Sequence, residues 1–89
     1  MAKTYFPIED SVELVTASKP HPSNTHYKVS RGTEIWDGEN VEVIKVQMVY
    51  NGEVAGRRSP SYPVGTDDYQ RVHLAIEKII RSRYKQKVA

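Results

Sequence analysis

The residues most able to do chemistry in this 89-residue chain are cations, and they gather toward its C-terminal end. Residues 57–89 hold eight Lys or Arg against three Asp or Glu, a net charge of +5, whereas residues 1–56 hold five against eight, a net charge of −3. Cations clustered on one surface bind phosphate groups, and such contacts weaken as the salt concentration rises. The charge pattern therefore predicts contact with DNA or RNA.

The predicted nucleic-acid interface combines an arginine pair with the helix expected after it. Its cations are Arg57, Arg58, Arg71, Lys78, Arg81, Arg83, Lys85 and Lys87. Tyr62 and Tyr84 lie near them in the sequence, and aromatic rings beside cations can stack on unpaired bases. Cations that contact phosphates do not distinguish one base from another, so the protein should have only a weak preference among nucleic-acid sequences. The alternative is a solvated helix face whose cations complement the negative end of the helix dipole.

Residues 66–86 are predicted to form an amphipathic helix that positions most of these cations. Thr66 is typical of an N-cap, and Asp67 and Asp68 place negative charge at the positive end of the helix dipole. At about 100° per residue, one apolar stripe is expected to face the core. This stripe comprises Tyr69, Val72, Ile76, Ile79 and Ile80. Leu74 lies on the far side, where the functional alternative to simple exposure is a contact with a second copy of the helix.

Four strands are predicted to precede this helix. They cover 11–17, 26–36, 41–50 and a stretch starting at residue 53, with an expected bulge or bend at Gly32. Asp37-Gly38 and Asn51-Gly52 accept the positive φ angles of tight hairpins. The fold class is therefore α+β, a four-stranded antiparallel meander followed by one C-terminal helix packed on one face. One domain is expected over 1–89, with 1–10 as a packed or flexible arm, 11–63 as the sheet and 66–86 as the helix.

The third predicted strand carries apolar side chains on both faces, although one helix can cover only one of them. The face opposite the helix, or the sheet edge, is predicted to be an interface. Its residues are Val41, Val43, Val49 and Val54. The alternatives for covering this face are residues 1–10, a second copy of the chain, or a ligand. Nucleic acid is less favoured here, because the face is expected to display mainly valines with Lys45 and Arg58.

No catalytic or metal-binding motif is evident in the sequence. His21, His26 and His73 have no ligand-like neighbours at helical or hairpin spacing, and there is no cysteine. No spacing brings a nucleophile and a base together on one element, so we predict no enzyme activity and no cofactor. Short matches such as the serines after Arg57 and Arg58 occur too often by chance to indicate a modification site.

Composition narrows the class of protein further. The chain is cysteine-free and has no apolar run of the roughly 18–20 residues that cross a bilayer, which favours a cytoplasmic protein without membrane contact. The sequence therefore predicts a small non-enzymatic binding module that contacts nucleic acid and forms a homo-oligomer. The alternative is a protein-interaction or regulatory module that self-associates.

Overall fold

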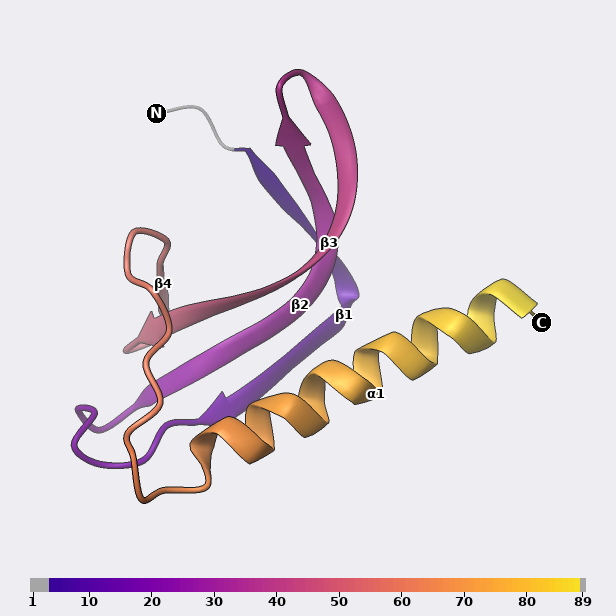
Figure 1. Ribbon diagram of the computed structural model, residues 1–89. Helices are drawn as coiled ribbons and strands as arrows, with labels where there is room; N and C mark the ends of the chain where they lie inside the picture. The colour runs from indigo at the N-terminus through magenta and orange to yellow at the C-terminus, as the bar shows by residue number, and fades with distance from the viewer. Residues whose placement is uncertain (1–3, 89) are drawn as a thin grey trace.

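The chain folds into a four-stranded antiparallel sheet with one C-terminal helix against it, which confirms the predicted α+β class (Figure 1). The computed structural model describes residues 4–88, and their side chains as far as Lys85. The elements are β1 (Tyr5–Thr16), β2 (Thr25–Trp36), β3 (Glu39–Tyr50), β4 (Glu53–Ala55) and α1 (Asp68–Val88). The sheet order follows the chain order, so β1 and β4 are its two edges. The molecule is only 20 Å thick, the depth of one sheet and one helix.

Both predicted hairpin turns are present and fix the register of the sheet. Asp37 and Gly38 have φ angles of 49° and 79°, and Asn51 and Gly52 have φ angles of 51° and 82°. Positive φ at both central residues suits the right-handed twist of paired strands. The second turn places Val49 opposite Val54, as the sequence predicts, and β4 ends at Ala55.

The bulge lies in β1 rather than at Gly32. Residues 5–10, expected as an arm, are the first half of β1, and the register with β2 shifts between Pro7 and Val12. Gly32 pairs without interruption with Val43 of β3, so β2 itself has no bulge; the extra residues lie in β1, between the Pro7–Gly32 and Val12–Ser30 pairs. The glycine is needed for a close approach instead: a Cβ there would lie 2.5 Å from the Phe6 carbonyl oxygen.

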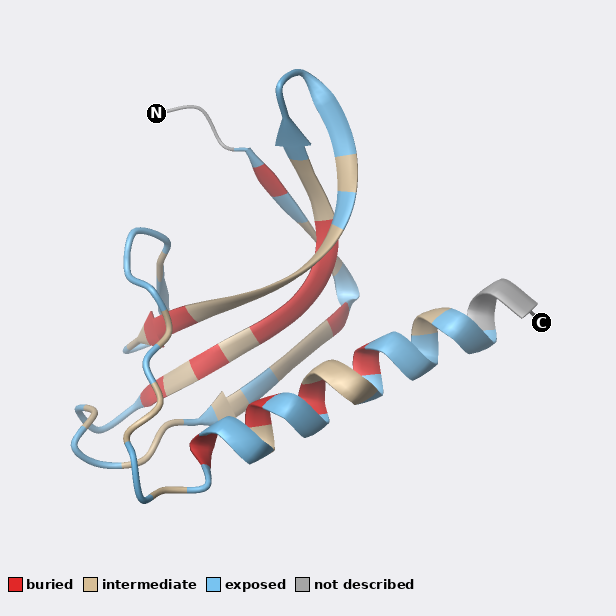
Figure 2. Ribbon diagram, viewed as in Figure 1, coloured by how far each residue is buried: buried red, intermediate tan, exposed pale blue. Residues whose placement is uncertain are grey.

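The core lies between one face of the sheet and α1, which runs beneath β1 and β2 (Figures 1 and 2). Its buried side chains come from the middle of β2, β3 and the helix. They are Tyr27, Val29, Met48, Val72, Ala75 and Ile79. The predicted helix stripe is partly wrong, because Tyr69 and Ile80 are exposed while Ala75 is buried. Within residues 4–88, α1 lacks the apolar length that crossing a membrane requires.

Candidate nucleic-acid interface

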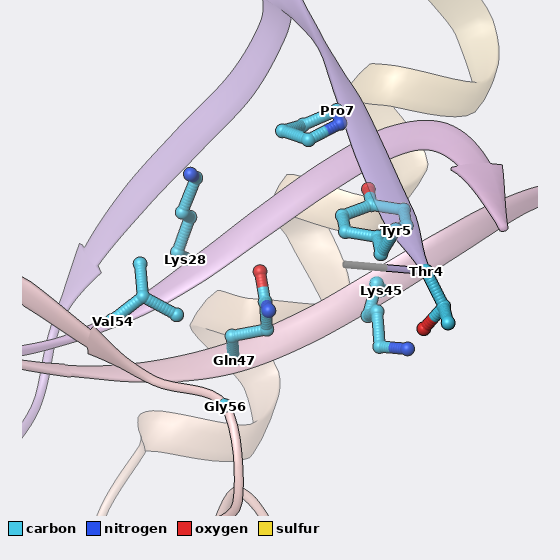
Figure 3. A pocket seen from close by; sticks show the side chains of 8 residues that line it. All are labelled: Thr4, Tyr5, Pro7, Lys28, Lys45, Gln47, Val54 and Gly56. Atoms are coloured by element: carbon cyan, nitrogen blue, oxygen red, sulfur yellow. The ribbon is translucent and has the colours of Figure 1, made fainter. Parts of the chain in front are cut away.

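The face of the sheet opposite α1 is concave and carries a hollow between the two edges of the sheet. A hollow of about 300 Å³ is lined by Thr4, Tyr5 and Pro7 from one edge of the sheet and by Val54 and Gly56 from the other. Residues of opposite edges can share one hollow only because the sheet bends over this face. Figure 3 shows Lys28, Gln47 and Lys45 on the floor between them, with α1 behind the sheet.

Two further hollows continue the first one. One of about 360 Å³ shares Lys28 and Val54 with it and extends to Asn24 and Asn51. The other, of about 200 Å³, shares Lys45, Gln47 and Gly56 and extends to Arg57. We call these three connected hollows the trough. Among the described residues no Asp or Glu lines these hollows, but Glu34 pairs with Lys45 beside them, so the uncompensated positive charges of the trough are those of Lys28, Arg57 and Arg58.

The two lysines of the trough differ in how they are held. Lys45 forms an ion pair with Glu34, and its Nζ lies 5.2 Å from the centroid of the Tyr5 ring. Lys28 has no hydrogen bond or ion pair to any side chain within residues 4–85, and it is half-buried. A cation with no internal partner on a concave, partly desolvated surface attracts an anion more strongly than one already neutralised.

Tyr5 forms the wall that turns the flat sheet into a trough. Its hydroxyl is hydrogen-bonded to the Ser30 hydroxyl at 2.7 Å, and the residue is 7 % exposed. A Cβ at Gly32 would lie 2.9 Å from the Tyr5 hydroxyl oxygen. The absence of a side chain at Gly32 therefore lets the first half of β1 close over the sheet.

A buried polar cluster anchors the start of α1 and holds the loops at that end of the sheet. Asp68 is fully buried and accepts hydrogen bonds from the backbone and hydroxyl of Ser18, from the Tyr27 hydroxyl at 2.7 Å and from Arg71 at 2.7 Å. Burial alone would raise the pKa of Asp68, but these hydrogen bonds and the Arg71 charge outweigh it and hold the pKa at about 2. Burial, then the hydrogen bond to Asp68, raises the pKa of Tyr27. The cluster is structural and lies across the sheet from the trough.

The structure does not bring the predicted cations together on one surface. Arg57 and Arg58 follow β4, at the sheet edge remote from the C-terminal turns of α1 (Figure 1). Three of the predicted cations are paired within the molecule: Arg71 with Asp67 and Asp68, Lys78 with Glu13, and Arg83 with Glu42. Arg81 and Lys85 are exposed on the helix, and the Lys87 side chain lies outside the described residues.

The two predicted stacking residues have different surroundings. Tyr62 is half-buried and stacks on Tyr27 with ring centroids 5.1 Å apart, so it belongs to the core margin. Tyr84 is 66 % exposed. Its ring is accessible, but it lies on α1, across the sheet from the trough.

The predicted interface valines are covered to different extents by the chain itself. Val49 is only 6 % exposed, and His26 and Val54 flank it on the neighbouring strands. Val41 and Val43 are half-buried, and Val54 is 44 % exposed. Leu74 is 63 % exposed on the helix, beside β1. Side chains of the neighbouring strands therefore supply part of the cover that the sequence predicted from elsewhere.

Sequence reasoning missed the contribution of β2 to this face. The Asp37-Gly38 turn pairs Trp36 with Glu39, and the same register places Lys28 opposite Gln47 and His26 opposite Val49. Counting back from that turn could have found both residues. No pattern in the sequence predicts that Tyr5 closes one side of the trough, because its position depends on the bulge in β1.

Within the described residues, no group of three or more His, Asp or Glu side chains is arranged to hold a metal ion. Comparison with known proteins adds no assignment: no family model matches the chain, and neither a curated protein nor a solved structure is significantly similar to it.

Proposed function

We propose that this protein is a non-enzymatic module that binds single-stranded nucleic acid in the trough. One observation carries the proposal: Lys28, Arg57 and Arg58 line the trough without an ion-pair partner among the described residues, and the only carboxylate held beside it is Glu34, which pairs with Lys45. Phosphates would contact these cations, and bases would lie over the apolar patch between Leu14 and Val54.

A single strand fits this surface better than a duplex. Asn24, Asn51 and Gln47 present amide groups at the floor and one end of the trough. Amides can hydrogen-bond to the Watson–Crick edges of bases, which are accessible only when the bases are unpaired. The trough is concave, whereas reading a duplex groove requires an element that projects into it. The proposal keeps the predicted ligand but moves the contact from the helix to the sheet.

The test is the binding of a fluorescent 12-nucleotide single strand, followed by anisotropy. Three phosphate contacts predict that the affinity falls roughly 15- to 20-fold between 50 and 200 mM salt, since each contact to a single strand contributes a slope of about 0.7. Lys28→Gln should weaken binding several-fold and reduce the slope by about 0.7. Lys85→Gln is the matched control, because it removes the same charge from α1, and it should leave binding unchanged.

Three results would contradict the proposal. The first is no binding at 50 mM salt. The second is a loss of affinity in Lys85→Gln as large as that in Lys28→Gln, which would show that the nucleic acid contacts α1. The third is equal competition by poly-glutamate, which would make the ligand an acidic peptide.

The second candidate function is protein interaction with self-association. It is favoured by the exposed apolar side chains that the fold leaves on α1. Leu74 is 63 % exposed, Ile80 46 % and Tyr84 66 %. This role is compatible with the first, because α1 and the trough lie on opposite faces of the sheet.

A further inference from the structure

One end of the trough lies at the edge of the sheet, where the short strand β4 stops. The hollow of about 200 Å³ there is lined by residues 45–47 of β3 and by residues 56–60, which leave β4 and turn back before the chain runs to α1 (Figure 1). It shares no lining residue with the hollow at Asn24 and Asn51, so the two hollows lie at opposite ends of the trough. We call the hollow of residues 45–47 and 56–60 the end pocket.

The end pocket holds most of the uncompensated positive charge of the trough. Arg57 and Arg58 both line it, and neither forms an ion pair within the described residues. Lys45 lines it as well, but its charge is paired with Glu34. Lys28, the remaining uncompensated cation, lines the two other hollows and not this one. Two neighbouring arginines at one end of the trough favour a ligand group that carries more than one negative charge.

Arg58 is positioned by contacts within the protein. Its backbone N–H donates to the Ala55 carbonyl oxygen at 3.1 Å, and its guanidinium lies 5.4 Å from the centroid of the Tyr50 ring. A guanidinium stacked on an aromatic ring keeps its N–H groups directed outward from its edge. An arginine that is held in this way loses less entropy when it binds a phosphate through two parallel hydrogen bonds.

The open edge of β3 adds a main-chain donor to the end pocket. Along a strand, backbone N–H groups point alternately to its two neighbours. Tyr50 and Met48 face β4, and Val46, two residues earlier, faces the same edge. Because β4 ends at Ala55, opposite Met48, no strand pairs with Val46 on that side in the described part of the chain. The Val46 backbone N–H is therefore left unpaired by the sheet at a residue that lines the end pocket.

This set of donors suits a terminal phosphate better than a phosphate inside a strand. An internal phosphodiester carries one negative charge and has two oxygens outside its ester bonds. A terminal phosphomonoester carries about −1.5 to −2 charges at pH 7 and has three acceptor oxygens. Two arginines and one backbone N–H can donate to three oxygens at once. Because the end pocket lies where the trough stops, a strand bound along the trough presents its terminus there.

We infer that the end pocket binds the terminal phosphate of the single strand. The ligand class is then an oligonucleotide that carries a phosphomonoester at its 5′ or 3′ end. This inference rests on the proposed function of the trough and names the part of the ligand that one end of the trough holds. Lys28 lies outside the end pocket, so the two contacts can be tested separately.

The test compares three 8-nucleotide single strands of one sequence, which are unphosphorylated, 5′-phosphorylated or 3′-phosphorylated. Each competes, unlabelled, with the fluorescent 12-nucleotide strand. A terminal phosphate at one end should tighten binding by about fivefold or more, and the end that gains affinity reports the direction of the strand in the trough. In the double variant Arg57→Gln/Arg58→Gln this gain should fall below about twofold. Lys28→Gln should weaken all three strands by the same factor and leave the gain unchanged.

Arg81→Gln/Lys85→Gln is the charge-matched control. It also removes two exposed cations, but from α1, across the sheet from the trough. It should change neither the affinity of the unphosphorylated strand nor the gain from the terminal phosphate. Circular dichroism checks that both double variants fold.

Equal binding of the three strands, or a gain that persists in Arg57→Gln/Arg58→Gln, would overturn the inference and leave the proposed function standing. Loss of the gain in Arg81→Gln/Lys85→Gln would also overturn it, because the phosphate would then contact α1. Conversely, a gain that requires the two arginines, together with no effect of Lys28→Gln, would support the end pocket and contradict binding along the trough. Failure of every strand to bind at 50 mM salt would overturn both proposals.

Discussion

Met48 and Gln47 are neighbours in β3, yet their side chains lie on opposite faces of the sheet and meet different surroundings. Met48 is fully buried against α1 and packs with Tyr27, Val29 and Val72. Gln47 is half-buried on the floor of the trough, where no second layer covers it. One face of the same strand is therefore a core, and the other is an accessible concave surface.

The difference shows that a sheet can partly cover a face by bending. Val49 is nearly as buried as the core residues, although α1 lies on the other side of the sheet. His26 and Val54 on the neighbouring strands flank it, while at the other end of this face the bulge in β1 and the missing side chain at Gly32 let Tyr5 approach Ser30. Such cover leaves a trough rather than a filled core, because side chains from the two edges line a common hollow without filling it.

The largest expected change in stability compares the two faces of β3 through the neighbouring residues Met48 and Gln47. Met48→Ala removes a fully buried side chain and should lower the free energy of unfolding by about 2–5 kcal/mol. Gln47→Ala, one residue earlier, should change it by less than about 1 kcal/mol, because its side chain borders solvent. Urea titration of both variants measures this contrast. Equal destabilisation would mean that the trough face is as tightly packed as the core face.

The buried carboxylate at the start of α1 should have the next largest effect. Asp68→Ala leaves Arg71 without its buried partner and Tyr27 without an acceptor, which should cost about 3 kcal/mol. In the native protein the pKa of Asp68 is held at about 2, below its ordinary value of 3.8. The stabilisation from its charge is therefore complete above about pH 5 and is lost as the pH falls from 4 toward 2.

Asp68→Asn, which keeps the shape of the side chain, is the control for this pH dependence. The stability difference between the parent and this variant should be constant at neutral pH and should narrow below pH 4. Urea titrations at pH 7, 4 and 3 measure it. A difference that persists unchanged at pH 3 would show that the Asp68 charge does not contribute to stability.

A smaller effect tests the closure of the trough. Gly32→Ala would place a Cβ 2.5 Å from the Phe6 carbonyl oxygen and 2.7 Å from the Pro7 Cα, so β1 must move, at a cost of about 1–3 kcal/mol. Gly56→Ala is the matched control, since nothing lies within 4 Å of a Cβ there. The Gly32 variant should also alter oligonucleotide binding, because the Tyr5 wall would shift. Unchanged stability would show that β1 does not approach β2 this closely.

The smallest effect is expected at the helix-side rim, where Glu42 bridges Arg83 and Arg31 at 2.6 Å from each. Hydrogen bonds from Arg83 and then Arg31 hold the pKa of Glu42 at about 2. Glu42→Gln should shift the urea midpoint only modestly, because the side chains of Glu42 and Arg83 are 39 % and 36 % exposed and salt screens their pair, and because glutamine still offers an oxygen to the buried Arg31. The shift should vanish as the pH falls from about 4.5 toward 2 or as salt rises. A large, salt-insensitive shift would place this pair in the core.

Local patterns in the sequence predicted the elements well because each depends on nearby residues. The Asn51-Gly52 pair fixed the β3–β4 register, since its positive φ angles demand a two-residue turn. The spacing of Val72, Ile76 and Ile79 predicted which helix face meets the sheet, because an α-helix repeats every 3.6 residues. The predicted apolar stripe was wrong at Tyr69 and Ile80, since α1 packs under β1 and β2 and leaves the side of the helix that carries these two residues uncovered.

The candidate site was harder to predict than the fold. The sequence grouped cations that are close along the chain, but Arg71, Lys78 and Arg83 are paired with carboxylates on the helix or on distant strands. Lys28, isolated among apolar and polar residues in the sequence, has no such partner among the described residues. Pairing over long sequence separations decides which charges remain available to a ligand, and composition cannot report it.

The sequence by itself determined the order of four strands and a helix, the two tight turns, and the excess of positive charge, because these depend on residue type and short-range spacing. Only the tertiary structure decided that the sheet bends away from its helix, that Tyr5 closes one side of the trough, and that three of the predicted helix cations pair with carboxylates. Those outcomes depend on which distant atoms come within a few ångströms of one another.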